Sequence, residues 1–170
     1  MNAAMLEHLA GLLARIAGVQ FMPAEKERCG QDLIAMLPAA SLPQAGIVLR
    51  DNGFFPEDLT VCDINEGLLA CYHFFLYEPP LRLTLRLLTE RESTLPSLQG
   101  LFPGMNWHER EAAEMFGLRF SGHPHLKPLL LDVNMDQAPL LKAPEQRRAM
   151  NDLGLLPKPT TDRHKENGLS

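Results

Sequence analysis

The sequence lacks the features that mark several common classes of protein. Only 6% of its 170 residues are aromatic, and its three cysteines, Cys29, Cys62 and Cys71, stand apart with no C-x-x-C pair. That spacing gives neither an iron–sulfur cluster nor a zinc knuckle its usual ligands. We therefore expect reduced thiols and no metal or cofactor held by cysteine.

Long runs of basic or of apolar residues are missing as well. The net charge is −5, and no run of Lys or Arg goes beyond Arg147-Arg148, so a nucleic-acid partner is not expected. The longest apolar stretch near the middle, residues 68–77, is interrupted by His73 and is far shorter than the ~20 residues of a bilayer span. Residues 1–18 have no basic start, which favours an amphipathic helix of the mature protein over a signal peptide.

Common catalytic motifs are also absent from the sequence. It contains no nucleophile elbow, no phosphate-binding loop and no dinucleotide-binding glycine pattern. The carboxylate pair Glu57-Asp58 follows Pro56 in an expected loop, with no recognisable acid or base partner. These absences favour a binding or scaffolding role.

What the N-terminal part does contain is helical periodicity. The chain is 45% hydrophobic and has the length of one ordinary domain. Apolar residues recur at three- and four-residue steps over residues 2–17, and Gly18 favours a stop. A second helical pattern begins after Pro23, continues to Leu37 and is ended by Pro38.

The middle of the chain has the pattern of a sheet. A short β-branched run over residues 47–50 leads into the turn signal at 51–53. Three strands are expected beyond it, at residues 59–64, 68–77 and 81–89. The last of them alternates strictly, which predicts one buried face and one face that is wet or turned to a partner. We expect an α+β fold: a small, mostly antiparallel sheet of about four strands, N-terminal helices and a C-terminal extended arm.

The part that follows the strands predicts two helices. Residues 95–101 favour a short one. Asn106 and Glu109 have the spacing of a capping box, and Gly117 is a good C-terminal cap, so a helix of about three turns is expected between them. From Asp132 onward the residues have no sustained period, which indicates an arm.

These patterns indicate a single domain over residues 1–145, followed by a partly flexible arm or tail at 146–170. Within the domain, the N-terminal helices are expected at 2–38, and the sheet with the helix after Asn106 at 45–131. A short helical piece is expected near 145–153.

The helix expected after Asn106 is dense in charge. Glu109, Arg110, Glu111 and Glu114 lie on it beside Trp107. Arg110 and Glu114, four residues apart, have the spacing of a surface ion pair. On an isolated domain this is a solvated face, whereas against another protein the same charges would set register and specificity.

A histidine and glutamate metal site is an alternative for the same region. His108, Glu111, His123 and His125 would be its ligands. The helix is not H-E-x-x-H, because Ala112 stands four residues after His108. His123, which precedes a proline, is more simply interpreted as a hydrogen-bonding turn residue, and we expect no metal here.

A family resemblance begins at Glu109. The residues that carry it are Glu109-Arg110-Glu111, Glu114, Met115-Phe116, His123, Lys127 and Leu129-Leu130. With their spacing they resemble the complete signature of the thirty-kilodalton subunit family of the respiratory-chain NADH dehydrogenase. The flanks at 58–63, 95–98, 102–107 and 139–142 are similar too, so that the resemblance covers roughly residues 55–145.

The resemblance implies a structural subunit without catalytic residues or cofactor. Members of the family are α+β subunits that bind a large quinone-module or hydrogenase-like subunit, with iron–sulfur subunits adjacent, in the soluble arm of a membrane-bound oxidoreductase. A peripheral place on the cytoplasmic side of the inner (plasma) membrane is implied, with membrane contact only through the complex. The implied partner-binding residues are Trp107, Glu109, Arg110, Glu111, Glu114, His123 and Lys127.

Two departures from the family pattern keep alternatives open. Residues 139–143 read Pro-Leu-Leu-Lys-Ala where the family usually has Pro-Leu-Arg-Lys-Asp, and His125 stands where an acid is common. An energy-converting NiFe hydrogenase is therefore an alternative to an NADH:quinone oxidoreductase as the parent assembly. From other classes, a free-standing His/Glu metal-dependent enzyme and a soluble homo-oligomeric interaction module remain.

Overall fold

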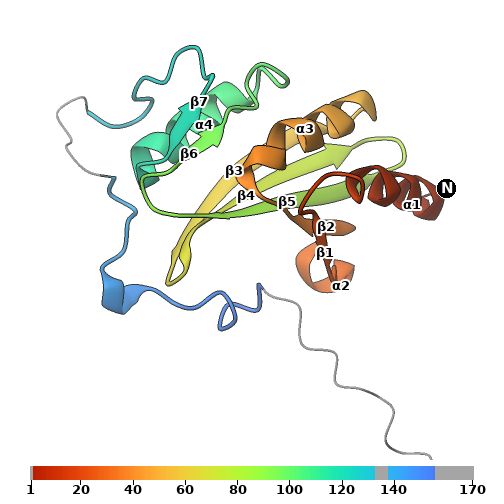
Figure 1. Cartoon of the computed structure of the whole chain (residues 1–170), viewed down its shortest axis with the longest axis horizontal. Helices are drawn as coiled ribbons and strands as arrows, with labels where there is room; N and C mark the ends of the chain where they lie inside the picture. The colour runs from red at the N-terminus through yellow and green to blue at the C-terminus, as the bar shows by residue number, and fades with distance from the viewer. Residues whose placement is uncertain (1, 133–137, 156–170) are drawn as a thin grey trace, which may run out of the picture.

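A five-stranded sheet organises the chain (Figure 1). Its strands are β1 (Gln20–Met22), β2 (Leu33–Met36), β3 (Phe55–Ile64), β4 (Gly67–Leu76) and β5 (Leu81–Thr89). In the order β1-β2-β5-β4-β3, only β2 and β5 pair in parallel. The computed structural model describes residues 2–132 and 138–155. The expected α+β class is confirmed, with five strands in this sheet where about four were expected.

The three long strands lie where the alternating pattern predicted them. Tyr72 in the middle of β4 pairs with Leu59 on β3 and with Leu85 on β5. The alternating leucines of β5 are all buried on the same face. Strand β3 begins earlier than expected, so that Glu57-Asp58 lie in the strand at an irregularity in its register and not in a loop.

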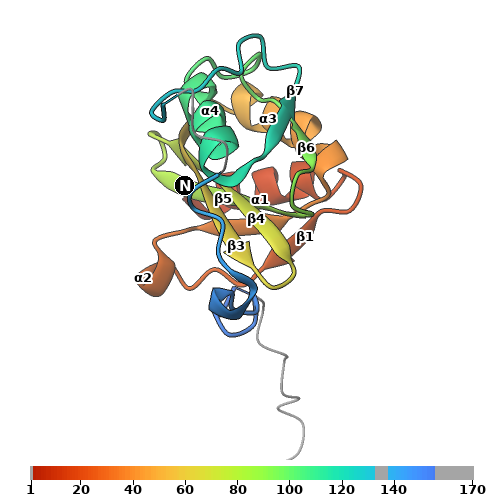
Figure 2. The same cartoon turned by 90° about the vertical axis from the view of Figure 1, so that its left-hand side faces the viewer.

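Helices cover one face of the sheet (Figure 2). They are α1 (Asn2–Leu13), α3 (Leu42–Asp51) and α4 (Met105–Phe116). A second, small parallel sheet consists of β6 (Thr94–Pro96) and β7 (Arg119–Ser121), the strands before and after α4. Each helix contributes buried side chains to the main core, for example Leu9 from α1, Leu49 from α3 and Ala112 from α4. The same core contains Tyr72 and Leu85 of the sheet. Burial of these apolar side chains is the main force that holds the helices to the sheet.

The helical interpretation of residues 23–37 was wrong in its second half. Only α2 (Lys26–Cys29) is helical, and Leu33–Met36 form β2. A short apolar run fits a buried strand as well as a helix, and pairing with β5 decides here. The β-branched run at 47–50 led to the opposite error, because it was interpreted as extended and lies in helix α3. Pro43 stands in the first turn of that helix, where proline is favoured.

Two smaller boundaries also differ from expectation. Residues 95–101 form β6 and turns where a short helix was expected, because the Leu95 side chain is buried and its backbone pairs with Phe120. Helix α1 ends at Leu13, and turns lead on to Gly18, which adopts a φ of 76°. That backbone conformation favours glycine, but the helix itself ends four residues before the expected end at residue 17.

The C-terminal arm, residues 138–155, runs along the opposite face of the sheet from the helices (Figures 1 and 2). It contains one short 3-10 helix, η2 (Pro144–Gln146), followed by turns, in place of a helix over 145–153. Met150 is buried against Ile64, Leu69 and Cys71. The packed body therefore continues past residue 145, and of the tail expected at 146–170, residues 156–170 lie outside the described residues.

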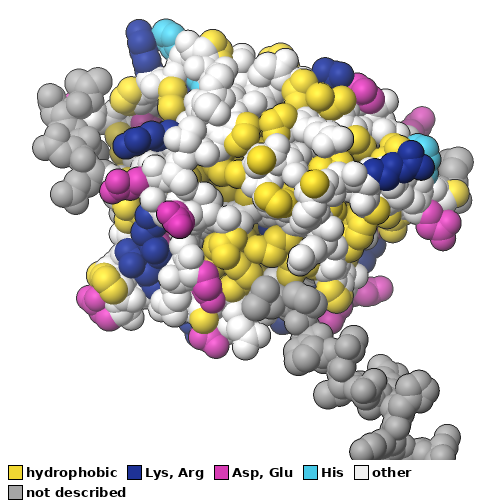
Figure 3. Space-filling model, in the orientation of Figure 1, with side chains coloured by type: hydrophobic (Ala, Val, Ile, Leu, Met, Phe, Trp, Pro, Cys, Tyr) yellow, Lys and Arg dark blue, Asp and Glu magenta, His cyan; other side chains and the backbone are white. Residues whose placement is uncertain are grey.

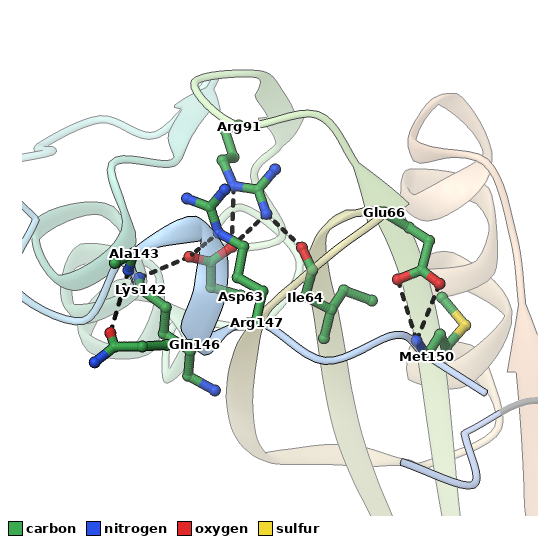
Figure 4. Close-up of polar contacts among 9 residues, drawn as sticks. All are labelled: Asp63, Ile64, Glu66, Arg91, Lys142, Ala143, Gln146, Arg147 and Met150. Atoms are coloured by element: carbon green, nitrogen blue, oxygen red, sulfur yellow. Dashed lines mark hydrogen bonds and ion pairs between the residues drawn. The ribbon is translucent and has the colours of Figure 1, made fainter. Parts of the chain in front are cut away.

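Asp63, at the end of β3, anchors this arm (Figure 4). Its buried carboxylate accepts hydrogen bonds from Arg91 (2.6 Å), from Arg147 (3.2 Å) and from the Lys142 backbone N–H (2.7 Å). Although burial alone would raise the pKa of Asp63, the Lys142 N–H and the two guanidinium groups lower it below the ordinary value. Glu66 adds a second attachment by accepting from the Met150 N–H at 3.0 Å.

Candidate functional site: the surface around α4

Helix α4 begins and ends on glycines. Gly104 precedes it without a side-chain cap, and Gly117 ends it in the left-handed conformation with its N–H donating to the Ala113 carbonyl. The predicted C-cap is confirmed, whereas the predicted capping box of Asn106 and Glu109 is wrong. Asn106 lies inside the first turn, and Glu109 binds elsewhere.

Glu109 holds the loop that precedes the helix. Its carboxylate accepts from the Leu98 N–H at 2.6 Å and from the Ser97 hydroxyl at 2.5 Å. Burial raises the pKa of Glu109 to about 7, although these two hydrogen bonds oppose the shift. Because this side chain has no exposed surface, it supports the site from within the chain.

Arg110 and Glu114 hold the loop that follows β7. Arg110 donates to the carbonyl oxygens of Lys127 and Pro128, both at 2.7 Å. Glu114 accepts from the backbone N–H groups of residues 129–131, the shortest bond being 2.8 Å to Leu129. The expected ion pair between the two side chains is replaced by these backbone contacts, because each side chain reaches a loop more directly than it reaches the other.

His123 ties the same loop together. Its Nδ1 accepts from the His125 N–H at 3.0 Å, and its Nε2 lies 3.4 Å from the Asn106 carbonyl oxygen. The interpretation as a turn residue fits these contacts. Within residues 2–132 and 138–155, no three His, Cys, Asp or Glu side chains lie where they could hold one metal ion. The structure therefore gives no support to a metal site of His108, Glu111, His123 and His125.

An apolar surface with a charged rim remains exposed beside these contacts. Trp107 is 67% exposed and Leu130 64% exposed. A hollow of about 180 Å³ lies between α4 and the loop, and Leu126, Lys127 and Ala113 are among its lining residues. In Figure 3 acidic and basic side chains alternate along the end of the molecule that carries α4 and the arm. We call Trp107, Glu111, Leu126, Lys127 and Leu130 the α4 surface.

The arm continues from this surface. The Leu140 N–H donates to the Met115 carbonyl oxygen in the last turn of α4 at 3.1 Å. Leu140 and Leu141 both expose their side chains there. Helix α4 and the start of the arm are thus joined through the backbone, and both present apolar groups outward.

Comparison with known proteins identifies the chain. Residues 35–149 match the model of the family described as respiratory-chain NADH dehydrogenase, 30 kDa subunit. The chain belongs to this family. The match includes α4, the loop after it and most of the arm, so the α4 surface is part of the fold that defines these NADH dehydrogenase subunits.

Individual members of the family are similar over most of this chain. The C subunit of an NADH-quinone oxidoreductase from Azorhizobium caulinodans is 41% identical over 81% of this chain and 69% of its own length. The corresponding protein of Xanthobacter autotrophicus is 42% identical over 65% of this chain, but the alignment spans only 56% of that protein. The J subunit of an NAD(P)H-quinone oxidoreductase from Parasynechococcus marenigrum is 34% identical over 74% of this chain and 75% of its own length.

Solved structures share the fold of this chain. A chain of an archaeal membrane-bound sulfane sulfur reductase superposes with a TM-score of 0.65 at 18% identity, over 75% of this chain and 77% of that one. A trypsin-resistant fragment of Nqo5 superposes with a TM-score of 0.58 at 22% identity, over 74% of this chain and 98% of the fragment. At these identities the likeness concerns the fold.

Sequence reasoning missed the contacts that shape the candidate site. Asp63 meets Arg147 across 84 positions, and no local pattern signals such a pair. The bond from Ser97 and Leu98 to Glu109 was hidden for another reason. The spacing from Asn106 suggested a local capping partner for Glu109, but its carboxylate binds the Leu98 N–H in the loop before the helix.

Proposed function

We propose that this chain is a non-catalytic structural subunit in the soluble arm of a complex-I-like membrane-bound oxidoreductase, and that it docks onto the large quinone-module subunit through the α4 surface. Family membership over residues 35–149 carries the first part of this proposal. The second part rests on the α4 surface itself. Its exposed apolar groups lie on a framework whose buried charges are already satisfied within the chain.

The internal hydrogen bonds of Glu109, Arg110 and Glu114 support docking in a specific way. They fix the loops on both sides of α4 before any partner arrives. A surface that is ordered in advance loses less conformational entropy on binding. Exposed Trp107, together with exposed Glu111 and Lys127, matches the composition of interfaces in which an aromatic residue supplies much of the binding energy.

The names of the relatives favour one parent assembly over the other. The similar proteins from Xanthobacter, Azorhizobium and Parasynechococcus are subunits of quinone oxidoreductases. We therefore propose an NADH:quinone oxidoreductase in preference to an energy-converting NiFe hydrogenase, with iron–sulfur subunits of that assembly nearby. The substitution of Leu141 and Ala143 for the usual Arg and Asp then reflects a more apolar contact with the same kind of partner.

The proposed position is peripheral, on the cytoplasmic side of the plasma membrane. None of the helices in the described part of the chain is long and apolar enough to cross a bilayer. Attachment to the membrane would come through the other subunits of the complex.

Co-purification tests the docking surface. A tagged chain carrying Trp107→Ala and Glu111→Lys should recover the large subunit at least about tenfold less well than the unchanged chain, because loss of an aromatic anchor removes about 2 kcal/mol or more of binding free energy. Both side chains are exposed or turned from the core, so the thermal midpoint of the isolated chain should stay the same.

The matched control places the same kinds of change elsewhere. Phe21→Ala with Glu27→Lys alters an exposed aromatic and an exposed acid near β1 and α2. This variant should recover the large subunit normally. Equal recovery by both variants would show that the α4 surface is not the docking site, and absence of the large subunit from the unchanged chain would refute the proposed assembly.

A further inference from the structure

The face of the sheet opposite the helices is only half covered by described residues. On β4, Leu69 and Cys71 lie under Met150 of the arm. His73 and Phe75 follow on the same face of the strand, because side chains alternate along it. Both are partly exposed, and Tyr77 just beyond the strand is 73% exposed. Aromatic side chains thus lie open beyond the arm.

Three aromatic rings form a cluster on this open half. Phe55 lies 5.6 Å from Phe75 and 5.3 Å from Tyr77, and Phe75 lies 5.1 Å from Tyr77, measured between ring centroids. The Arg82 guanidinium stacks over the Phe75 ring at 5.3 Å and pairs with Glu57 at 3.3 Å. The cluster is therefore held in place by its own contacts, although Tyr77 is mostly in solvent.

A polar pocket of about 330 Å³ opens beside this cluster. Its lining includes Gln31, Glu57, Asp58, His73 and Arg82. Glu57 is neutralised by Arg82. Asp58 lies 3.8 Å from the Nε2 of His73, but burial lowers the pKa of that imidazole, so at neutral pH it carries no charge to offset Asp58. The pocket therefore has a net charge of about −1.

The acceptor of the pocket that carries an unbalanced charge is the Asp58 carboxylate, whose side chain is about half exposed. His73 already shares a hydrogen bond of 2.9 Å with the Thr84 hydroxyl through Nδ1. Gln31 has a buried Oε1 without a hydrogen-bond partner among the described residues. The exposed Asp58 carboxylate therefore offers a site for a cationic group with several N–H donors. Flat aromatic rings lie next to it.

We propose that this half-face is a second docking surface, which takes an arginine side chain from a neighbouring subunit of the assembly. A guanidinium group combines N–H donors for the Asp58 carboxylate with a planar surface that stacks on aromatic rings. Residues flanking that arginine pack on Tyr77. The inference rests on the proposed function, since it takes the partner from the same complex, but it concerns a surface separate from α4.

Photo-crosslinking in the assembled complex tests the inference. The full-length chain carrying Tyr77→p-benzoylphenylalanine is irradiated within the assembly purified through its tag, and the joined peptides are identified by mass spectrometry. The expected product is a crosslink to a segment of another subunit that contains an arginine. Adding Asp58→Asn should lower its yield about tenfold, as expected for the loss of about 1.4 kcal/mol from a partly exposed ion pair.

The matched control places the same photoreactive residue at Ile47 on α3, which is exposed but lies on the helix side of the sheet. It should not capture the same segment. A crosslink from position 77 to residues 156–170 of this chain would overturn the inference, as would a partner segment without arginine or no crosslink at all in preparations that contain the large subunit. If the large subunit is missing, the proposed function fails and this inference fails with it.

Discussion

Two buried carboxylates fix loops in this molecule, and they do so by opposite means. Asp63 is surrounded by the guanidinium groups of Arg91 and Arg147, and its pKa lies below the ordinary value. Glu109 has only neutral donors, Ser97 and the Leu98 N–H, and burial raises its pKa to about 7. The comparison shows that a buried acid can hold a loop either as a charged ion-pair centre or as a group that is close to neutral.

Because of this difference, the two carboxylates make stability depend on pH in opposite directions. Stability from Asp63 is present above the ordinary value of 3.8 and is lost as the pH falls through the lowered pKa. Glu109 acts in the reverse sense. Its unfolded form ionises first as the pH rises, so that stability falls between pH 4.5 and about 7 and then stays constant.

The largest expected effect comes from Asp63→Asn. Removing this charge leaves Arg91 and Arg147 facing each other without their shared partner. Breaking a buried ion pair in this way lowers the free energy of unfolding by about 3–5 kcal/mol. Urea denaturation at pH 7, followed by circular dichroism, measures the loss.

The control for Asp63→Asn is Asp51→Asn. Asp51 also pairs with an arginine, Arg50 at 2.8 Å, but both of these side chains are about half exposed. Its loss should change the free energy of unfolding by less than about 1 kcal/mol. If the two variants lose the same stability, the contrast between a buried and an exposed pair does not hold in this protein.

A second effect, on the order of 3 kcal/mol, is expected for Glu109→Gln across the pH range. Because the pKa of Glu109 rises from 4.5 to about 7, the free energy of unfolding of the wild type should fall by about 3 kcal/mol between acid and neutral pH. The variant cannot ionise there and should lose correspondingly less. Denaturation midpoints collected from pH 4.5 to 8 measure the difference in slope.

Glu111→Gln is the control on the same helix, because Glu111 is exposed. Its pH profile should follow that of the wild type. A Glu109→Gln profile that runs parallel to the wild type would mean that Glu109 is ionised normally in the folded protein.

The smallest expected effect is on the rate of thiol labelling at Cys71, which should respond to a change at Asp63 but not at Glu109. Burial raises the pKa of the Cys71 thiol to about 12, and Met150 of the arm covers it. With Cys29→Ser and Cys62→Ser as background, Asp63→Asn should speed thiol labelling of Cys71 at least about tenfold by loosening the arm, which requires about 1.4 kcal/mol. Glu109→Gln should leave the rate unchanged, and equal acceleration by both would refute a local role for Asp63.

The sheet could be predicted from the sequence because its strands carry their own signal. Alternation on β5 and the turns at Asn65-Glu66-Gly67 and Glu78-Pro79-Pro80 bound the long strands without help from the rest of the chain. The β2 strand could not be predicted in this way. Its four residues follow a helical spacing with the residues before them, and pairing with β1 on one side and with β5, about fifty positions away, on the other makes them a strand.

The sequence pointed to the region of the candidate site but not to the contacts inside it. Motif spacing pointed to α4, and Trp107 is exposed there as docking requires. The same spacing could not show that Glu114 binds the backbone of residues 129–131, since a carboxylate four residues from Arg110 has an obvious local partner. On α4, side chains that bind loops of the chain alternate with side chains that face solvent. Only the three-dimensional structure shows which residue belongs to which group.

The attachment of the arm to the hairpin between β3 and β4 also bears on biosynthesis. Ile64, Leu69 and Cys71 leave the ribosome 79 to 86 residues before Met150, the side chain that covers them. A nascent chain that has completed its sheet therefore displays an apolar strip until translation is nearly finished, which is the kind of surface that aggregates or recruits chaperones. Ribosome-bound chains that expose β4 while Met150 is still inside the exit tunnel should consequently be stickier than the released chain.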